Sequence, residues 1–159
     1  MSSELLLGEF RRTIDDRFRL NVPNELASKL AEEGTECVLA KERPGCVSLW
    51  EQTAWKTRLD ASVQIVRTKA EAGRLDHRLA DLQRFGRLLS TRHRTVQLAG
   101  RGRLVVPEGF REFLKVEPGG EVMVVGAAVC IEIWQIDAWL ECLDTQIADF
   151  GKLLDELAN

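Results

Sequence analysis

Apolar and polar positions at the start of the chain alternate with the period of β-strands and then follow that of a helix. Residues 8–14 and 19–22 flank a polar stretch at residues 15–18, which predicts a hairpin. Pro23 ends the second strand, and Asn24 is placed to cap a short helix. Leu26 and Leu30 form the apolar face of that helix. Two more strands are predicted at residues 36–41 and 46–50, with an Arg-Pro-Gly turn between them.

The same order of elements is predicted again in the second half. The expected strands and the helix that begins at Pro107 cover residues 93–98, 103–106, 107–115, 121–125 and 129–134. One constant offset superimposes the two halves without a gap. It places Trp50 on Trp134 and Trp55 on Trp139, which accounts for all four tryptophans of the chain. The chain is therefore predicted to be an internal duplication.

Helical periodicity predicts three further helices, two between the repeats and one at the end of the chain. Gly73 separates the first two. The apolar stripe of the third could pack within its own subunit or form a seam between subunits. The apolar positions of the three helices are Trp55, Leu59, Val63 and Val66; Leu75, Leu79, Leu82, Phe85 and Leu89; and Leu143, Ile147, Phe150, Leu154 and Leu157.

Composition limits the chain to one good core or two small ones, because 159 residues with 45% apolar content cannot stabilise more. The formal net charge of -3 conceals a concentrated basic segment. Residues 83–106 carry six arginines and no acid, whereas residues 108–159 carry eleven acids and three basic residues. The net charge therefore understates any basic face.

Catalytic chemistry is not indicated by any motif. There is no cluster of His, Cys, Asp and Glu at working spacing and no complete phosphate-binding loop, so neither an enzyme nor a cofactor, metal or small-molecule substrate is expected. His77 and His93 are isolated, and surface or capping roles are expected for them. No secretory signal or membrane span is predicted. Buried thiols are expected at the four cysteines, Cys37, Cys46, Cys130 and Cys142.

Arginines near the two predicted tight turns are the candidate binding residues. Asp15, Arg17 and Arg19 surround the first turn, and Arg101 and Arg103 occupy the corresponding places around the second. A guanidinium group beside a tight turn suits phosphate oxygens or guanine edges. Asp15 can accept hydrogen bonds from turn N–H groups or pair with Arg19. A solvated hairpin with a weak surface ion pair is the alternative interpretation.

The sequence resembles the MraZ family of bacterial transcriptional regulators over nearly its whole length. The resemblance lies in residues 8–23, in the second turn with Pro107, in residues 124–126 and 131–134 with Trp139, and in the linking helix around residues 84–89. The family signature is DxxxR in each repeat, commonly with glycine before the arginine. Here Phe18 stands in place of that glycine in the first repeat, and Ala99 replaces the aspartate in the second.

The resemblance implies an α+β fold of two tandem AbrB-like, swapped-hairpin units with linking and C-terminal helices. The expected division is a first repeat with its trailing helix at residues 8–70, a linking helix at 71–91, and a second repeat with the C-terminal helix at 92–159. It also implies a ring-shaped homo-oligomer that binds direct repeats in double-stranded promoter DNA.

The function expected from these features is a sequence-specific DNA-binding transcriptional regulator of cell-division and cell-wall genes, located in the cytoplasm at the nucleoid. Asp15, Arg17, Arg19, Arg101 and Arg103 would form its DNA-binding site. The alternative is an oligomeric interaction or scaffold protein of the same fold that no longer binds DNA.

Overall fold

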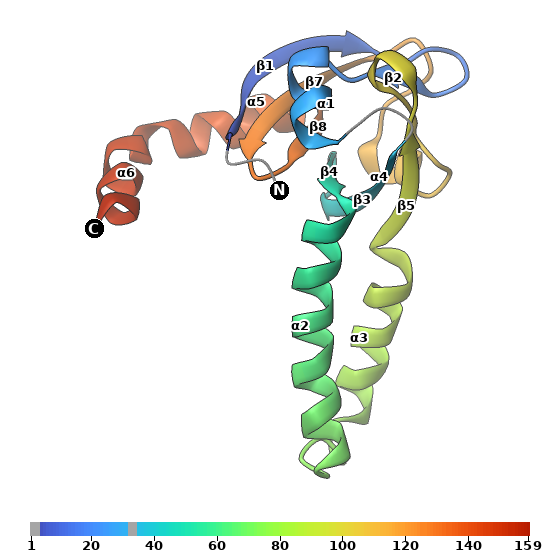
Figure 1. Cartoon of the computed structure of the whole chain (residues 1–159), viewed down its shortest axis with the longest axis vertical. Coiled ribbons are helices and arrows are strands. Elements are labelled where there is room, and N and C mark those ends of the chain that lie inside the picture. Colours follow the sequence, from blue (N-terminus) through green and yellow to red (C-terminus); the bar gives the residue numbers. More distant parts are fainter. Residues whose placement is uncertain (1–3, 32–34) are drawn as a thin grey trace.

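The computed structural model of the chain describes residues 4–31 and 35–159. Figure 1 shows a β-rich body, a helical hairpin that projects from it, and a C-terminal helical segment that extends to one side. We call the projecting hairpin the stalk; it consists of α2 (Gln52–Glu71) and α3 (Leu79–Thr91). We call the C-terminal segment the arm; it consists of α5 (Ile136–Gln146), the 3-10 turn η2 (Ile147–Asp149) and α6 (Phe150–Ala158).

The body is built on a six-stranded antiparallel sheet in the order β1-β7-β8-β4-β3-β5. The first strand of each half pairs with the other half. Strand β1 (Leu6–Thr13) lies against β7 (Glu121–Ala128), and β5 (His93–Leu98) lies against β3 (Thr35–Arg43). The two halves also meet at the centre, where β4 (Cys46–Glu51) pairs with β8 (Ile131–Gln135). Both halves therefore contribute to one continuous sheet.

A second, two-stranded sheet joins β2 (Arg19–Asn21) to β6 (Arg103–Val105). This corrects the predicted hairpin over residues 8–22. The turn itself forms, with the Asp15 N–H donating to the Arg19 carbonyl at 3.1 Å, but β1 and β2 then pair with different partners. The reason is burial, because Leu20 and Leu104 face each other in the register and are 1% and 0% exposed. Pairing β2 with β6 covers both leucines.

The core draws on both halves, and equivalent positions of the two halves are used in the same way. Apolar side chains of the sheets and short helices form the main cluster of the core. Two smaller clusters contain the tryptophans, whose rings pack alike: the centroids of Trp50 and Trp55 are 5.7 Å apart, and those of Trp134 and Trp139 are 5.5 Å apart. The starts of β2 and β6, and those of α2 and α5, are separated by the same offset as Trp50 and Trp134.

The two short helices begin differently from the prediction. Helix α1 (Asn24–Leu30) has Pro23 as its N-cap, so Asn24 is the first helical residue and makes no side-chain cap. The Pro23 carbonyl accepts instead from the backbone N–H groups of the first turn. Helix α4 (Phe110–Leu114) starts three residues after Pro107 because its N-cap, Gly109, has a φ of 87°.

The stalk follows the predicted break, since Gly73 has a φ of 74° in the connection between its helices. The arm does not form the single helix that was expected, because the 3-10 turn at Ile147 interrupts it. The fold-back alternative is also wrong from Ile147 onward, because nothing among the described residues covers that part of the stripe. Its side chains are exposed, with Ile147 at 62%, Phe150 at 65%, Leu154 at 54% and Leu157 at 77%.

Candidate nucleic-acid interface

The first arginine-bearing loop is organised by the carboxylate of Asp15. Its Oδ1 accepts from the backbone N–H groups of Arg17 and Arg19, both at 2.9 Å, and its Oδ2 accepts from Arg19 Nε at 2.6 Å. Both interactions expected for Asp15 therefore occur together. The backbone hydrogen bond from Arg19 and the adjacent guanidinium lower the pKa of Asp15, so it stays ionised at neutral pH. The loop thus fixes the direction of the Arg19 side chain.

The second loop has the same backbone closure without the carboxylate. The Ala99 N–H donates to the Arg103 carbonyl at 2.9 Å, as the Asp15 N–H does to Arg19. Arg101 and Gly102 both adopt left-handed backbone, with φ of 62° and 75°. An alanine methyl cannot accept a hydrogen bond, and the exposed Arg103 forms no ion pair with any carboxylate of the described residues. Arg103 is therefore less constrained than Arg19.

The two loops are brought together by the pairing of β2 with β6. We call the unit formed by residues 15–21 and 99–105 the arginine ribbon. Its strands are antiparallel, with Leu20 opposite Leu104 at the centre, so the two loops lie at opposite ends of the ribbon. All five predicted site residues belong to this unit.

The outward face of the ribbon carries two side chains that sequence reasoning missed. Leu20 and Leu104 point into the core, so alternation turns the flanking positions outward, where Arg19 lies opposite Val105 and Arg103 lies opposite Asn21. Asn21 is exposed and Val105 is 49% exposed. The alternation around the two leucines was the signal that could have identified them.

Arg111 supports the first loop from behind. Its guanidinium lies 4.0 Å from the centroid of the Phe18 ring, and its Nε donates to the Val106 carbonyl at 2.7 Å. A stacked arginine of this kind holds the ring by a cation–π contact. Phe18 is thus half-buried although its backbone is left-handed, with a φ of 57°.

The arrangement suits contacts with both the base edges and the phosphate backbone of a nucleic-acid duplex. A two-stranded ribbon fits the major groove of B-DNA, where arginine forks can bind guanine and asparagine can bind adenine. Guanidinium groups at both ends of the ribbon can contact phosphate oxygens. Buried apolar side chains beneath the ribbon hold it on the body. The ribbon therefore presents four arginine side chains from strands and loops that are held against the body.

Other chemistry is limited among the described residues. No group of three His, Cys, Asp or Glu side chains in residues 4–31 and 35–159 is placed to hold a metal ion. No helix over the same residues is long and apolar enough to cross a membrane. The four cysteines are free and buried, as predicted, and burial raises the pKa of Cys37 to about 11 and that of Cys130 to about 12.

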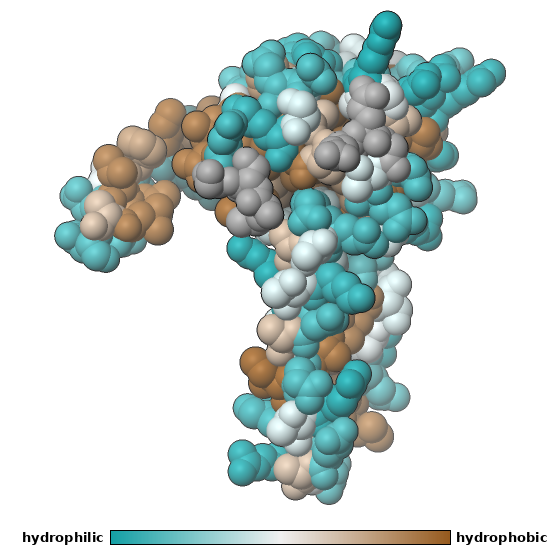
Figure 2. Space-filling view, in the orientation of Figure 1, coloured by the Kyte–Doolittle hydropathy of each residue, from teal (hydrophilic) through white to brown (hydrophobic). Residues whose placement is uncertain are grey.

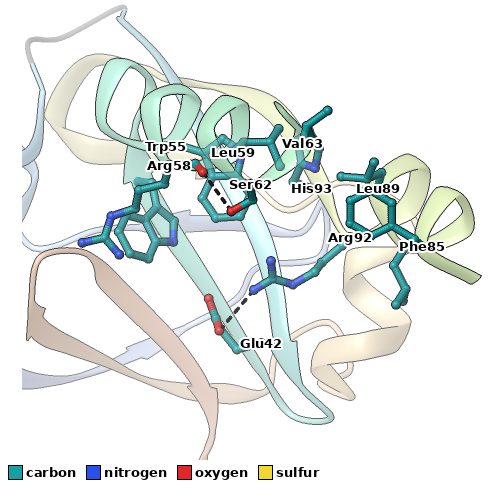
Figure 3. Close-up of a pocket in the computed structure, with 12 residues that line it drawn as sticks. Glu42, Trp55, Arg58, Leu59, Ser62, Val63, Phe85, Leu89, Arg92 and His93 are labelled. Atoms are coloured by element: carbon teal, nitrogen blue, oxygen red, sulfur yellow. Dashed lines mark hydrogen bonds and ion pairs between the residues drawn. The ribbon is translucent and has the colours of Figure 1, made fainter. Parts of the chain in front are cut away.

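A groove of about 520 Å³ lies where the stalk meets the sheet (Figure 3). Its walls are mainly apolar, with charged side chains at the rim. His93, for which a surface or capping role was expected, is half-buried here with its ring 5.5 Å from that of Trp55. The Arg92 guanidinium pairs with Glu42 at 3.6 Å, and its Nε donates to the Lys41 carbonyl.

Comparison with known proteins finds similarity to one family of regulators. Residues 90–156 match a family model described as "MraZ protein, putative antitoxin-like". The chain is 28% identical to the transcriptional regulator MraZ of Alkaliphilus metalliredigens over 155 residues. That alignment covers 98% of this chain and 95% of the Alkaliphilus protein. The chain is similar to MraZ proteins over nearly its whole length.

Other MraZ proteins align over similar lengths. The transcriptional regulator MraZ of Syntrophomonas wolfei is 24% identical over 98% of both chains. That of Thermus thermophilus is 26% identical over 89% of both chains. MraZ is a family of transcriptional regulators and not of enzymes, in agreement with the prediction made from the sequence.

Proposed function

We propose that the protein is a sequence-specific DNA-binding regulator that acts on direct repeats in promoter DNA of cell-division and cell-wall genes. The observation that carries the proposal is the arginine ribbon, which presents Arg19 and Arg103 on one outward face and Arg17 and Arg101 in its two end loops. The Asp15 carboxylate holds Arg19 in place, which reduces the entropy lost when Arg19 binds DNA. The names of the relatives support regulation of transcription.

The fold proposed is a pair of tandem AbrB-like, swapped-hairpin units. Its support is the exchange of first strands, with β1 on the second half and β5 on the first. The units would comprise residues 8–70 and 92–159, joined by the linking helix at 71–91. Because each half supplies a strand to the other, neither unit is expected to fold alone.

Several subunits are proposed to act together as a homo-oligomer, with a closed ring as its form. One ribbon offers few contacts, so useful affinity requires repeated sites to be bound at once. The exposed apolar side chains of the arm support assembly, because surfaces of this kind commonly mark interaction sites. Binding to chromosomal DNA would place the protein in the cytoplasm at the nucleoid.

An interaction protein that keeps the fold without binding DNA is the second candidate. The observation that favours it is Ala99, which leaves Arg103 without the carboxylate that orients Arg19. A protein of this kind would show no preference for any DNA fragment.

A titration distinguishes the two candidates. Labelled DNA from immediately upstream of the protein's own gene is titrated at several salt concentrations, with a scrambled fragment of equal length as the control. A DNA-binding regulator should prefer the upstream fragment, and its affinity should fall as salt rises because bound arginines release counterions from DNA. Equal weak binding to both fragments would favour the interaction protein.

A further inference from the structure

The groove between the stalk and the sheet has the size and lining of a small-molecule site. Its volume of about 520 Å³ falls within the range of about 300–1,000 Å³ that such sites occupy. Figure 2 shows apolar side chains at the surface of the stalk among hydrophilic ones, and Figure 3 shows α2 and α3 facing each other across the groove. Besides Trp55, the apolar side chains that the two helices contribute are Leu59, Val63, Phe85, Leu88 and Leu89.

One residue of the lining has a buried hydrogen-bond donor without an acceptor. Trp55 is 8% exposed, and its indole Nε1 donates to no acceptor among the described residues. The equivalent indole of the second half has a partner, because Trp139 Nε1 donates to a Glu9 carboxylate oxygen at 2.5 Å. The offset that relates the two tryptophans places His93 at the position of Glu9, so the first half lacks that carboxylate. A buried donor left unpaired is unfavourable, and an acceptor oxygen supplied by a ligand would satisfy it.

A guanidinium group at the rim of the groove has no carboxylate beside it. Arg58 is exposed, and its guanidinium carbon lies 5.1 Å from the ring centroid of Trp50. It forms no ion pair with any acid of residues 4–31 and 35–159. The other arginine of the lining, Arg92, pairs with Glu42 at 3.6 Å. With histidine counted as neutral, the lining holds two arginines against one glutamate, and this net charge of +1 favours an anion.

The unpaired indole and the free guanidinium group lie on the same side of α2. Trp55 and Arg58 are three residues apart in this helix, a spacing that brings side chains together on one face. Leu59 and Val63 continue the lining at steps of four residues, and the helix rises about 12 Å from Trp55 to Val63. A ligand that reaches both polar groups therefore has its anionic end near the sheet and an extended apolar part along the stalk.

We propose that the groove binds a straight-chain carboxylate of medium length, a molecule like a short fatty acid. One carboxylate oxygen accepts from Trp55 Nε1, and the guanidinium group of Arg58 donates to the other. The alkyl chain lies between α2 and α3, where it covers Leu88, which is 53% exposed. The ligand thus supplies the acceptor that Glu9 provides for Trp139 in the second half. This site goes beyond the proposed function and does not depend on DNA binding.

Isothermal titration calorimetry with decanoate tests the proposal, with decanol and decylammonium as probes of equal chain length. Decanoate should bind saturably and raise the melting temperature. Decanol should bind more weakly because it brings no charge to Arg58, and decylammonium should bind least because the arginines repel it. Equal binding of decanoate and decanol would overturn the proposal. An absence of saturable decanoate binding, the result expected if a second copy of the chain fills the groove, would overturn it as well.

Arg58→Gln should weaken decanoate binding about tenfold or more, because the carboxylate loses a charged hydrogen-bond partner. Arg58 is exposed, so the fold should be preserved. The matched control is Arg67→Gln, which replaces an exposed arginine of α2 that does not line the groove. The control should bind decanoate like the wild-type protein. Equal decanoate affinities of the two variants would overturn the proposal.

Two further variants test where the ligand lies. Trp55→Phe removes the unpaired N–H and should weaken decanoate binding about two- to tenfold, whereas Trp139→Phe makes the same change outside the groove and should leave the affinity unchanged. Leu157→Asp, at an exposed position of the arm, should also bind like the wild-type protein. Full affinity in Trp55→Phe, or loss of binding in Leu157→Asp, would overturn the proposal. If Trp55→Phe does not fold, the comparison of Arg58→Gln with Arg67→Gln still decides the proposal.

Discussion

Phe18 and Gly102 are equivalent residues of the two loops, and each accepts a hydrogen bond from the residue that follows the opposite strand of the ribbon. Both have left-handed backbone, with φ of 57° and 75°. The Phe18 carbonyl accepts from the Val106 N–H at 2.9 Å, and the Gly102 carbonyl accepts from the Val22 N–H at 2.8 Å. The two loops therefore form one structural unit, and a change in one should affect the other.

Gly102→Ala should destabilise the fold and the ribbon together. A Cβ atom at this position would collide with the Val22 carbonyl oxygen, and left-handed backbone costs a non-glycine residue about 1–2 kcal/mol in addition. The matched control is Gly109→Ala, which has a φ of 87° but no atom within 4 Å of its Cβ position. Urea unfolding should show a larger loss for Gly102→Ala. Equal losses would mean that the close approach to Val22 is unimportant.

Asp15→Ala should weaken DNA binding, and Ala99→Asp should strengthen it. The first change removes the acceptor of three hydrogen bonds in the first loop, so the Arg19 fork is no longer held. The second offers Arg103 the same support. Affinities are measured by titration at moderate salt. If both effects have the opposite sign, the acid acts mainly by repelling DNA phosphates and not by orienting arginine.

Asn21→Ala should relax the preference for one base pair while leaving the salt dependence of binding nearly unchanged. Its uncharged amide lies beside Arg103 on the outward face of the ribbon, where it can bind a base edge but releases no counterion. The expected loss of discrimination is about 1–3 kcal/mol at that base pair. A panel of single-base operator variants measures it. Uniform weakening across the panel would place Asn21 away from the bases.

Glu132→Gln should stabilise the protein at neutral pH and lose that advantage in acid. Burial raises the pKa of Glu132, and the nearby Glu42 raises it further, although a hydrogen bond from Trp134 and the charge of Arg43 oppose the rise. The fold therefore penalises the ionised form. Glutamine removes the penalty and keeps an acceptor for Trp134 Nε1, which lies 3.0 Å from the carboxylate.

Thermal unfolding of Glu132→Gln at two pH values checks the sign. The gain in melting temperature should be present above the folded pKa of Glu132, should shrink as pH falls through that value, and should be absent below the ordinary value of 4.5. Glu108→Gln, an exposed control, should change the melting temperature little at either pH. A gain for Glu132→Gln that is the same at both pH values would exclude ionisation as its cause.

The sequence predicted the positions of helices and strands better than it predicted which strands pair. The tryptophan repeat and the break at Gly73 can be read directly from the sequence, and both have clear structural counterparts. Pairing of β1 with β7 joins residues more than a hundred positions apart, and strand periodicity does not specify a partner. The break at Ile147 was missed because the apolar stripe of the arm continues in phase across it.

The charged residues of the candidate site were predicted from the sequence, and its uncharged residues were not. Arg19 and Arg103 stand out beside tight turns, whereas Asn21 and Val105 become notable only once Leu20 and Leu104 are known to face inward. Two polar residues that accept hydrogen bonds from tryptophan side chains, Ser48 and Glu132, were also missed. Ser48 and Glu132 are equivalent positions of the two halves and accept from the indole N–H of Trp50 and Trp134, but in sequence each is an ordinary polar strand position.

DNA binding by single arginine variants tests the central claim most directly. Arg19→Ala and Arg103→Ala are titrated against upstream DNA over a range of salt, with Arg74→Ala as the matched control, because Arg74 is exposed in the connection between the two stalk helices. Each ribbon variant should lose about 1–3 kcal/mol per bound site and lower the salt slope by about one, while keeping its melting temperature. Arg74→Ala should bind like the wild-type protein. Wild-type affinity in both ribbon variants would contradict the assignment of the ribbon as the DNA-binding surface.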